Sequence, residues 1–456
     1  MPSSGAGPEL LTQLPPRLAV GGGLVLPLLG RAAGAGAVAL RAGAGPWTNA
    51  EVCGVGADGR FWALLALDAA SAGATLGIAA RVTAAGSVTE VEVARVTVDP
   101  PSGAQPTGDP GRIAICLPAH EPDGALLRAQ LESLRAQTHT GWVCLIDDDA
   151  SSPAGRAVIR DAVAGDPRFV VREHDERAGV YRNVERALRN LPQDAGLVAL
   201  CDQDDRWAPD KLERLAAALH GDPRATLAHS DLRIVDRAGA VLAPTAWTER
   251  RRSEDRLRDL VTANTVTGAA SLLRRAVLAD ALPFPVPIGP DAFHDHWLAL
   301  TAAATGAIAY VDAPLVDYVQ HEGNVLGHRP LRGPRSPAPR AERWRASYAE
   351  VLLYRQALAM TLLLRCGARM AARDRREVTR TAAGPRAPLA LAARAVSGAG
   401  RPRRTLGHEW RALRGALWLA QARRAGSAAA PGGPLDGLVS PAWPTGSSSR
   451  PSPSSG

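Results

Sequence analysis

Lysine is nearly missing from this chain of 456 residues, in which Lys211 is the only lysine among 53 basic side chains. The net charge of +8 is therefore carried by arginine, a skew that indicates a biased nucleotide composition of the genome. A basic balance suits anionic partners such as nucleoside diphosphates, acidic lipid surfaces or nucleic acid, and by itself it selects none of them.

Cysteine is sparse as well. The five cysteines form no CxxC pair, their number is odd, and three of them stand inside apolar runs. A buried, reduced cysteine behaves as a small hydrophobic side chain. The pattern therefore favours a reducing compartment over a framework of disulfides.

Long apolar runs are also lacking. The best candidate for a membrane span, residues 18–40, is interrupted by Gly21–Gly23, Pro27 and Arg31, whereas a spanning helix needs about 18 apolar residues in a row. The start of the chain contains Glu9 and no early positive cluster, which argues against a secretion signal. We therefore expect a cytoplasmic protein.

The composition of the chain predicts globular domains with loose ends. A hydrophobic content of 46% with 21% charged residues allows a buried core, and 456 residues are enough for two or three domains. Residues 1–46 and 426–456 are rich in Gly, Ala, Pro and Ser. Such segments bury little apolar surface, so we expect a flexible N-terminal segment and a disordered C-terminal tail.

Residues 47–98 alternate apolar and polar side chains in short runs bounded by glycines, which predicts a small β-rich module. The prolines and glycines of residues 99–110 indicate a linker. A new domain should then begin at residue 111.

Residues 111–330 should form an α/β domain, because short apolar runs alternate with helical stretches. Strands separated by single helices indicate a parallel sheet with helices on both faces. The expected strands are Ile113–Leu117, Trp142–Ile146, Phe169–Val171, Leu197–Cys201 and Thr226–His229. The expected helices are Leu126–Arg135, Ala154–Ala164, Val180–Leu191 and Pro209–Leu219.

Polar clusters follow three of these strands, at Pro118–Glu121, Asp147–Asp149 and Asp202–Asp205. Ligands of open parallel sheets bind beyond the carboxyl ends of the strands. All three clusters should therefore face one crevice.

Residues 331–425 should form basic helices, with helical patterns at Trp344–Leu364 and Leu406–Ala422. Seven arginines and a single glutamate fall within residues 401–424. A basic amphipathic helix can lie on an anionic membrane surface, and a helical hairpin packed on the catalytic domain fits the pattern equally well.

The segment Asp202–Leu212 contains the most informative chemistry. Carboxylates clustered at the end of a buried strand repel one another unless a cation compensates them. Mg²⁺ and Mn²⁺ favour oxygen ligands and commonly bridge carboxylates to substrate phosphates. An acidic turn that caps the helix beginning at Pro209 is the alternative interpretation.

Six motifs between residues 112 and 327 resemble, in order and spacing, those of family 2 glycosyltransferases with the GT-A fold, and most closely the rhamnosyltransferase-like branch. They are Leu117–Glu121, Asp147–Ser151, Asp202–Leu212, Thr267–Ala269, His294–Trp297 and Tyr318–His321. The resemblance implies a Rossmann-like domain that binds a nucleotide sugar. One departure is visible, because Asp149 and Ala150 stand where many members have a glycine.

The resemblance also implies roles for individual residues. Those expected at the nucleotide are Pro118, Glu121, Asp147, Asp148, Arg177, Arg182 and Asp202. Those expected at a Mg²⁺ or Mn²⁺ ion are Asp202, Asp204, Asp205 and His321. Those expected at the transferred sugar or the acceptor are Trp207, Thr267, Gly268, His294 and Trp297, although both tryptophans could equally be packing residues.

Asp295 matches the general base of the family. An inverting transfer needs a carboxylate that takes the proton of the attacking hydroxyl. A helix should begin directly after Asp295, so the same side chain could also act as an N-cap. Zinc is disfavoured, because no further cysteine or histidine stands at ligand spacing near His294 and His296.

These observations predict an inverting glycosyltransferase that moves a sugar from a nucleoside-diphosphate sugar, with dTDP-rhamnose as the suggested donor. The acceptor would be a hydroxyl of a glycan or lipid-linked molecule in cell-envelope polysaccharide synthesis. A nucleotidyltransferase is the first alternative, but residues 117–123 lack a Gly-rich phosphate loop. A nucleic-acid-binding or scaffold protein is the second, but the Arg-rich region lacks interleaved aromatics.

Overall fold

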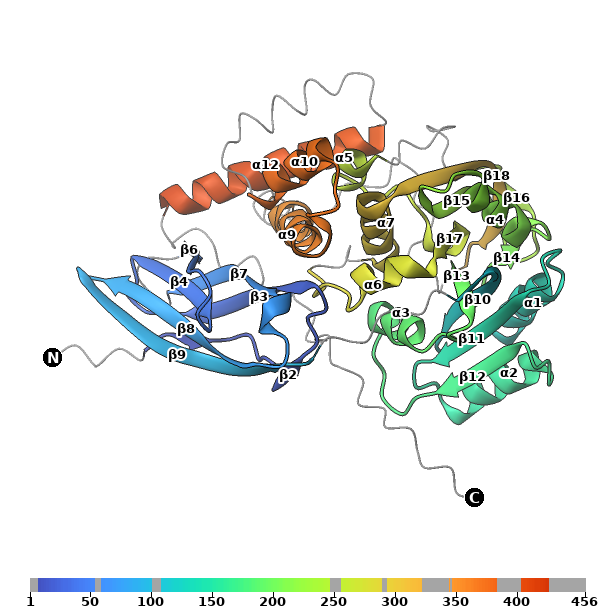
Figure 1. The fold of residues 1–456 in the computed structure, drawn as a ribbon, viewed down its shortest axis with the longest axis horizontal. Helices are drawn as coiled ribbons and strands as arrows, with labels where there is room; N and C mark the ends of the chain where they lie inside the picture. The colour runs from blue at the N-terminus through green and yellow to red at the C-terminus, as the bar shows by residue number, and fades with distance from the viewer. Residues whose placement is uncertain are drawn as a thin grey trace.

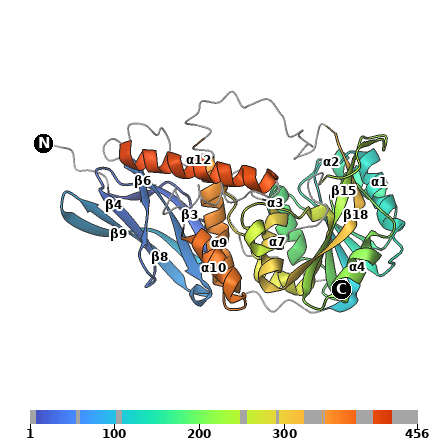
Figure 2. The same ribbon diagram turned by 90° about the horizontal axis from the view of Figure 1, so that it is seen from above.

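The computed structural model describes residues 7–53, 59–100, 108–246, 256–288, 293–321, 344, 347–383 and 403–425. These residues form three parts in a row: an N-terminal β-sandwich, a group of C-terminal helices and an α/β domain (Figure 1). The view from above shows the same order, with the C-terminal helices between the sandwich and the α/β domain (Figure 2).

The N-terminal part consists of two sheets that enclose an apolar core of leucine, valine and alanine. The first sheet has the order β1 (Glu9–Leu10), β3 (Gly23–Arg31), β7 (Arg60–Asp68) and β6 (Glu51–Cys53). The second has the order β2 (Arg17–Leu18), β9 (Ser87–Val98), β8 (Thr75–Ala84), β4 (Ala37–Ala42) and β5 (Thr48–Asn49).

The expectation of a flexible segment over residues 1–46 is wrong for the described residues 7–46. Leu24, Leu26 and Leu28 of β3 are fully buried in the sandwich, so the β-rich module begins near Glu9 and not at Trp47. Glycine here does not indicate disorder, because Gly21, with a positive φ of 55°, lies in the turn that leads into β3. The β-rich character expected for residues 47–98 is present in β5 to β9.

The α/β domain is built on one mixed sheet. Its order is β12 (Phe169–Glu173), β11 (Trp142–Asp148), β10 (Asp109–Ala119), β13 (Ala195–Leu200), β17 (Ser271–Arg274), β15 (Ala225–Val235), β18 (Ala307–Val319) and β14 (Arg206–Trp207), with β16 (Val241–Ala243) beside β15. The first four strands are parallel, as expected. The short strand β17 runs antiparallel between β13 and β15 and separates them, which the sequence had not indicated.

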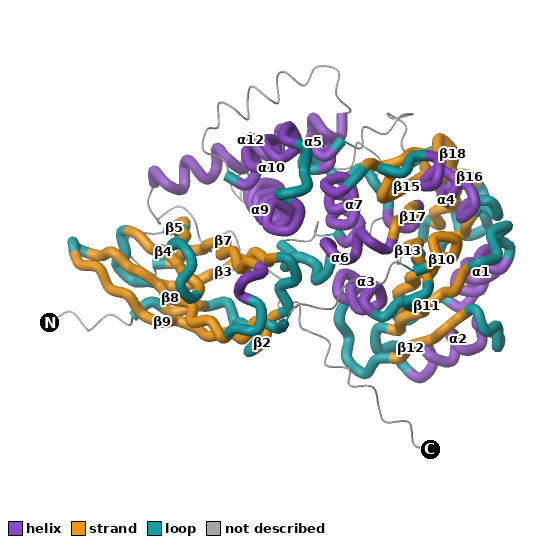
Figure 3. The backbone as a smooth tube through the Cα atoms, viewed as in Figure 1, coloured by secondary structure: helices purple, strands orange, loops and turns teal. Residues whose placement is uncertain are grey.

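Helices cover both faces of this sheet, which confirms the α/β fold (Figure 3). On one face the core holds side chains of α1 (Gly124–Arg135), α2 (Pro153–Val163) and α4 (Lys211–Gly221). On the other it holds side chains of α3 (Val180–Arg189) and α7 (His294–Thr305). Short elements complete the domain: α5 (Leu257–Leu260), η2 (Gly268–Ala270), η3 (Arg275–Val277) and α6 (Leu278–Ala281). The residues of β10 alternate between the two cores, because successive side chains of a strand point to opposite faces.

The C-terminal region is helical where the structure describes it, with the π-helical turn η4 (Tyr348–Leu353), α9 (Tyr354–Cys366), α10 (Ala372–Ala382) and α12 (Arg403–Ala425). Leu358 and Leu362 of α9 and Ala416 and Leu419 of α12 are buried in the same core as α7. The apolar faces of α9 and α12 therefore pack in one core with the α/β domain, as the packed-hairpin interpretation predicts. None of the described helices is both long and apolar enough to cross a bilayer. The tail at 426–456 and most of the expected linker at 99–110 lie outside the described residues.

Arg365 of α9 joins the three parts. Its buried guanidinium donates to the carbonyl of Gly23 at 2.7 Å, at the start of β3, and to those of Ala281 at 3.0 Å and Pro283 at 2.7 Å in the α/β domain. It also lies 5.4 Å from the ring centre of Trp297 on α7. One side chain thus links the sandwich and α9 to the helix whose first turn contains Asp295.

Candidate active site

The three polar clusters meet at one edge of the sheet, as expected. Strand β10 pairs in parallel with both β11 and β13, and its Ala119 lies opposite Asp148. Gln203 fastens the third cluster to the first, because its side chain accepts from the amide of His120 at 3.0 Å and donates to the carbonyl of the same residue at 3.3 Å. The register of the sheet therefore positions the clusters, and the glutamine holds them in place.

Glu121 and Asp148 stand at the start of α2. Glu121 accepts from the amide of Ser152 at 2.5 Å, and this bond lowers the pKa of the glutamate. Asp148 accepts from the amide of Ser151 at 3.2 Å and pairs with Arg156 at 3.3 Å. Both carboxylates are therefore anchored in defined positions at the edge where a nucleotide was expected, and Glu121 is held in its ionised form.

Asp147 is enclosed at the end of β11, and its expected role at the nucleotide stays a prediction. Its side chain is fully buried and bonds His174 at 2.6 Å and Arg186 at 3.2 Å. Pro118 lies opposite it on β10. Because side chains alternate along a strand, Asp147 and Asp148 point to opposite faces of the sheet.

Asp149, the residue that departs from the family pattern, caps the start of α3. Its two oxygens accept from the amides of Ala178 at 2.7 Å and Gly179 at 2.8 Å, and Arg186 pairs with it at 3.0 Å. Arg186 thus bridges Asp147 and Asp149 and holds two strand-end acids together. No sequence motif includes Arg186, and only its place on the polar face of α3 could have indicated a role.

The two arginines expected at the nucleotide do not converge on the cleft. Arg182 is buried, pairs with Glu185 on the same helix and donates to the carbonyl of Phe284 at 3.2 Å. It therefore fastens α3 to the segment before α7, which corrects its expected contact with phosphate. Arg177 is exposed in the loop before α3.

Asp202, Asp204 and His321 come together beyond β13. His321 lies 2.9 Å from an oxygen of Asp204, although 117 residues separate them. Burial raises the pKa of Asp202 to about 7, and the carboxylates of Asp204 and Asp295 add to this rise. The charges of Asp204 and Asp295 therefore lie near enough to Asp202 to disfavour its ionised form.

Asp205 is buried near Asp202 and Asp204, and its expected place at a metal stays a prediction. Its carboxyl group is buried, accepts from the amide of Val319 at 3.2 Å, and has its pKa raised well above the usual range by burial. Lys211 lies within electrostatic range of it, is completely buried and donates to the carbonyl of Ala269. Burial lowers the pKa of Lys211 to about 7, against the opposing effect of Asp205 and other neighbours.

Lys211 has a role that the sequence analysis missed. Its ammonium lies 3.1 Å from the ring centre of Trp207 and bonds the carbonyl of Ala269, so the lysine joins the acidic motif to the segment Thr267–Ala269. Trp207 is 4% exposed and packs in the core. Its expected contact with a sugar is therefore wrong, and the indole serves as a platform for the lysine.

Asp295 lies in the first turn of α7, and its carboxylate accepts from three donors. Its Oδ1 accepts from Asn264 Nδ2 at 2.9 Å, and its Oδ2 faces the amide of Gly268 at 3.3 Å. The amide of His296 also donates to Oδ1, at 2.6 Å. Asp295 is not the N-cap that was the alternative interpretation, because α7 begins at His294 and Phe293 is its N-cap. Asn264 was not found from the sequence, because it lies outside the recognised motifs.

Thr267, Gly268 and His294 surround Asp295. A Cβ atom on Gly268 would lie 3.2 Å from the Cβ of Asp295 and 3.2 Å from Nε2 of His294, so this position has little room for a side chain. Burial lowers the pKa of His294 and thereby favours the neutral imidazole. Thr267 is half-buried at the start of η2. The segment Thr267–Ala269 and α7 therefore pack closely together.

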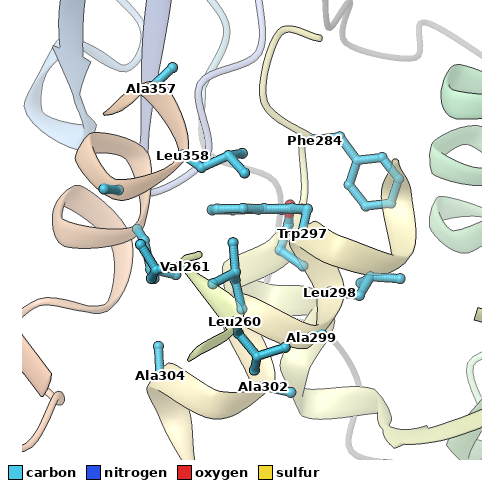
Figure 4. Close-up of a cluster of buried hydrophobic side chains, with 14 of the residues drawn as sticks. Leu260, Val261, Phe284, Trp297, Leu298, Ala299, Ala302, Ala304, Ala357 and Leu358 are labelled. Atoms are coloured by element: carbon cyan, nitrogen blue, oxygen red, sulfur yellow. The ribbon is translucent and has the colours of Figure 1, made fainter. Parts of the chain in front are cut away.

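Trp297 is a core residue, which corrects its expected contact with a sugar. It is completely buried and donates to the carbonyl of Ala281 at 2.7 Å. Phe284, Leu260 and Leu358 surround it (Figure 4). The indole lies on the face of α7 that packs against α9, so it supports the helix that positions Asp295.

The side chains at this site supply only some of the ligands that a divalent cation needs. Among the described residues, no three or more His, Cys, Asp and Glu side chains converge as a complete metal site. Asp204 and His321 form a close pair, and the raised pKa of Asp202 shows that its carboxylate is incompletely compensated. Proteins commonly bind Mg²⁺ through one or two carboxylates, and substrate phosphates then supply further oxygen ligands.

Residues 114–282 match the sequence model of the family described as Glycosyl transferase family 2. This segment, less than half of the chain, is therefore similar to the domain of family 2 glycosyltransferases. The match covers β10 to α6 and includes Asp148, Asp202 and Asp204, whereas Asp295 and His321 lie beyond its end. The mixed sheet with helices on both faces agrees with the GT-A fold expected for the family.

Two curated relatives align with part of the chain. The succinoglycan biosynthesis protein ExoW of Rhizobium meliloti is 32% identical over 108 residues, which are 22% of this chain and 32% of that protein. The uncharacterized protein y4gI of Sinorhizobium fredii is 32% identical over 120 residues, or 26% of this chain and 13% of that protein. The chain thus spans about a third or less of the length of these relatives.

Solved glycosyltransferases are similar only at a distance. Residues 1–349 of TarS of S. aureus, in complex with UDP-GlcNAc, align with a TM-score of 0.40 and 15% identity over 69% of this chain and 92% of TarS 1–349. The mannosyltransferase PcManGT of Pyrobaculum calidifontis, in complex with GDP-Man and Mn2+, has a TM-score of 0.36 and 21% identity over 71% and 90% of the two chains.

Proposed function

We propose that this chain is an inverting glycosyltransferase that moves a sugar from a nucleoside-diphosphate sugar to an acceptor hydroxyl. The observation that carries the proposal is the position of Asp295. Its carboxylate and that of Asp204 both lie near enough to Asp202 to raise the pKa of that side chain, and Asp202 and Asp204 belong to the segment that matches family 2. One acid is thus available for the acceptor, and a separate acidic pair for the leaving diphosphate.

The proposed reaction is a single displacement. The acceptor oxygen forms a bond to the anomeric carbon while the bond from that carbon to the diphosphate breaks, and the diphosphate leaves with the electron pair. The acceptor proton passes to Asp295. Asn264 and the amide of Gly268 orient the carboxylate for this transfer.

Mg²⁺ or Mn²⁺ would be held by Asp204 and Asp202, with His321 beside Asp204. When bound, such an ion neutralises charge on the diphosphate. Glu121, Asp148 and Pro118 would line the nucleoside pocket, because the carboxylates of Glu121 and Asp148 are fixed at the adjoining strand ends. A rhamnose donor and an acceptor in a cell-envelope polysaccharide are finer proposals, supported by the resemblance of the motifs.

A thermal-shift screen of nucleotide sugars with Mn²⁺ tests the proposal. A ligand that binds only the folded state at a hundred times its Kd adds about 2.7 kcal/mol of stability. For a chain of this size we expect a rise in Tm of roughly 3 °C with one donor class. Free sugars serve as the control, and an equal response to them, or no response to any nucleotide sugar, would contradict the proposal.

We further propose that α12 contacts the cytoplasmic face of an anionic membrane. Trp410 and Leu417 are exposed on it, and the spacing of Trp410, Arg414 and Leu417 places all three on one stripe. Wild-type protein should co-sediment with anionic liposomes in low salt and be released by high salt. Trp410→Ala should weaken this binding, whereas the control Leu242→Ala, at an exposed leucine of β16, should not. Equal binding of the two variants would contradict the contact.

A nucleotidyltransferase is less well supported than a glycosyltransferase. The segment after β10 contains Glu121 and Asp123 in place of a Gly-rich phosphate loop. The same thermal-shift screen separates the two, because a nucleotidyltransferase should respond to nucleoside triphosphates as strongly as to nucleotide sugars.

A further inference from the structure

The outer face of the second sheet of the sandwich holds an aromatic and charged cluster that the proposed chemistry does not use. In β8, Ile78, Ala80 and Val82 point into the sandwich core, so Ala79 and Arg81 point outward. Figure 1 shows β8 and β9 on the side of the sandwich away from α9 and α12. The described helices therefore leave this face open.

Trp47 lies on this face against two arginines. The guanidinium of Arg81 lies 4.0 Å from its ring centre, and that of Arg41 lies 4.4 Å away. Arg81 also pairs at 2.7 Å with Glu90, which stands opposite it on β9. The indole is half-buried and does not belong to the sandwich core. Two cation–π contacts therefore fix its orientation while part of the ring stays open to solvent.

Small and charged side chains alternate around this tryptophan. Across the sheet, Arg41 lies opposite Ala79, and Ala79 lies opposite Glu92. Glu92 also pairs with Arg95 at 2.7 Å. Arginine forks donate and carboxylates accept, and here both kinds of group stand beside a rigid aromatic ring. Opposite charges nearly cancel across the cluster, so it does not form the basic surface that nucleic acid or an anionic membrane requires.

We propose that Trp47, with Arg41, Arg81 and Glu90, forms a secondary site that binds a pyranose chain of the glycan acceptor. A pyranose ring presents an apolar C–H face, which suits an open indole, and hydroxyls that both donate and accept, which suit paired arginine and glutamate side chains. The site would hold a growing polysaccharide near the enzyme between transfers. Its link to an acceptor rests on the proposed transferase activity, whereas binding of a glycan can be measured independently.

Affinity electrophoresis of the full chain in native gels tests the proposal. The probes are three neutral polysaccharides, a β-glucan, a galactomannan and a rhamnan, and one acidic polysaccharide, alginate. At least one neutral probe should retard the wild-type protein. Trp47→Ala should weaken this retardation at least about tenfold, as expected for a central tryptophan anchor. Trp410→Ala is the matched control, because it removes another solvent-accessible indole and should leave the retardation unchanged.

A second variant, Arg81→Gln, tests the same site in case Trp47→Ala fails to fold. It keeps the indole and removes an exposed ion pair, which costs little stability, and it should also weaken retardation. The proposal is overturned if no neutral probe retards the wild type, if alginate alone does so, or if the variants at positions 47 and 81 behave like Trp410→Ala. Donor binding should be unchanged in both variants, so a failed donor screen and a failed glycan site remain distinct outcomes.

Discussion

Replacing Asp295 by asparagine should reduce kcat by about 10²- to 10⁴-fold, the usual contribution of a general base. The amide can still accept from Asn264, so the site should keep its shape, but it cannot take a proton from the acceptor. Donor binding should change little, because the diphosphate is assigned to Asp202 and Asp204. Product formation at saturating donor and the donor-induced rise in Tm measure the two effects separately.

Asp374→Asn is the matched control for this experiment. Asp374 also stands in the first turn of a helix, α10, which packs against α9 and lies outside the cleft. Its replacement changes the same charge at the same kind of position and should leave kcat within twofold of wild type. Turnover near the wild-type level in Asp295→Asn would show that another group accepts the proton.

Replacing Asp204 by asparagine should have the second large effect. Even partners that only orient a metal ligand commonly change metal affinity or activity by 10- to 100-fold, so loss of a direct ligand should weaken the apparent Mn²⁺ affinity by at least about 100-fold. Turnover should vanish in EDTA and return with Mn²⁺ or Mg²⁺ in the wild type. Asp204→Asn should need far more metal for the same rate.

Asp210→Asn is the matched control for the metal experiment. Asp210 follows Asp204 in the same motif, but its side chain is about half exposed and lies 3.6 Å from Arg214 on the surface. Its replacement should leave the metal requirement unchanged. Full activity of the wild type in chelator would contradict the assignment of Asp204 as a metal ligand.

The sequence predicted the parts of the fold whose signals are local. The parallel strands β10 to β13 and the helices between them were expected close to their observed ends, since apolar runs and helical periodicity repeat there without interruption. Strand β17 was missed because Ser271–Arg274 is too short to show a period of its own. The sandwich strand β3 was missed because glycine and alanine were weighed above its buried leucines.

For the site, the motifs predicted which side chains gather but not which way each one points. Asp204 and His321 were expected at one ion and lie 2.9 Å apart. Asp205 and Trp207 belong to the same motif, yet both are buried, because their orientation depends on packing against β18 and α4. Asn264 could not be assigned, since only the folded chain brings it to Asp295.

The most direct test of the central claim is a titration of Mn²⁺ into wild-type protein and Asp204→Asn, with and without a nucleoside diphosphate. If the cleft binds the diphosphate through a cation, each ligand should strengthen the binding of the other in the wild type, and Asp204→Asn should lose this coupling. Independent binding of the two ligands, or equal coupling in both proteins, would contradict the account.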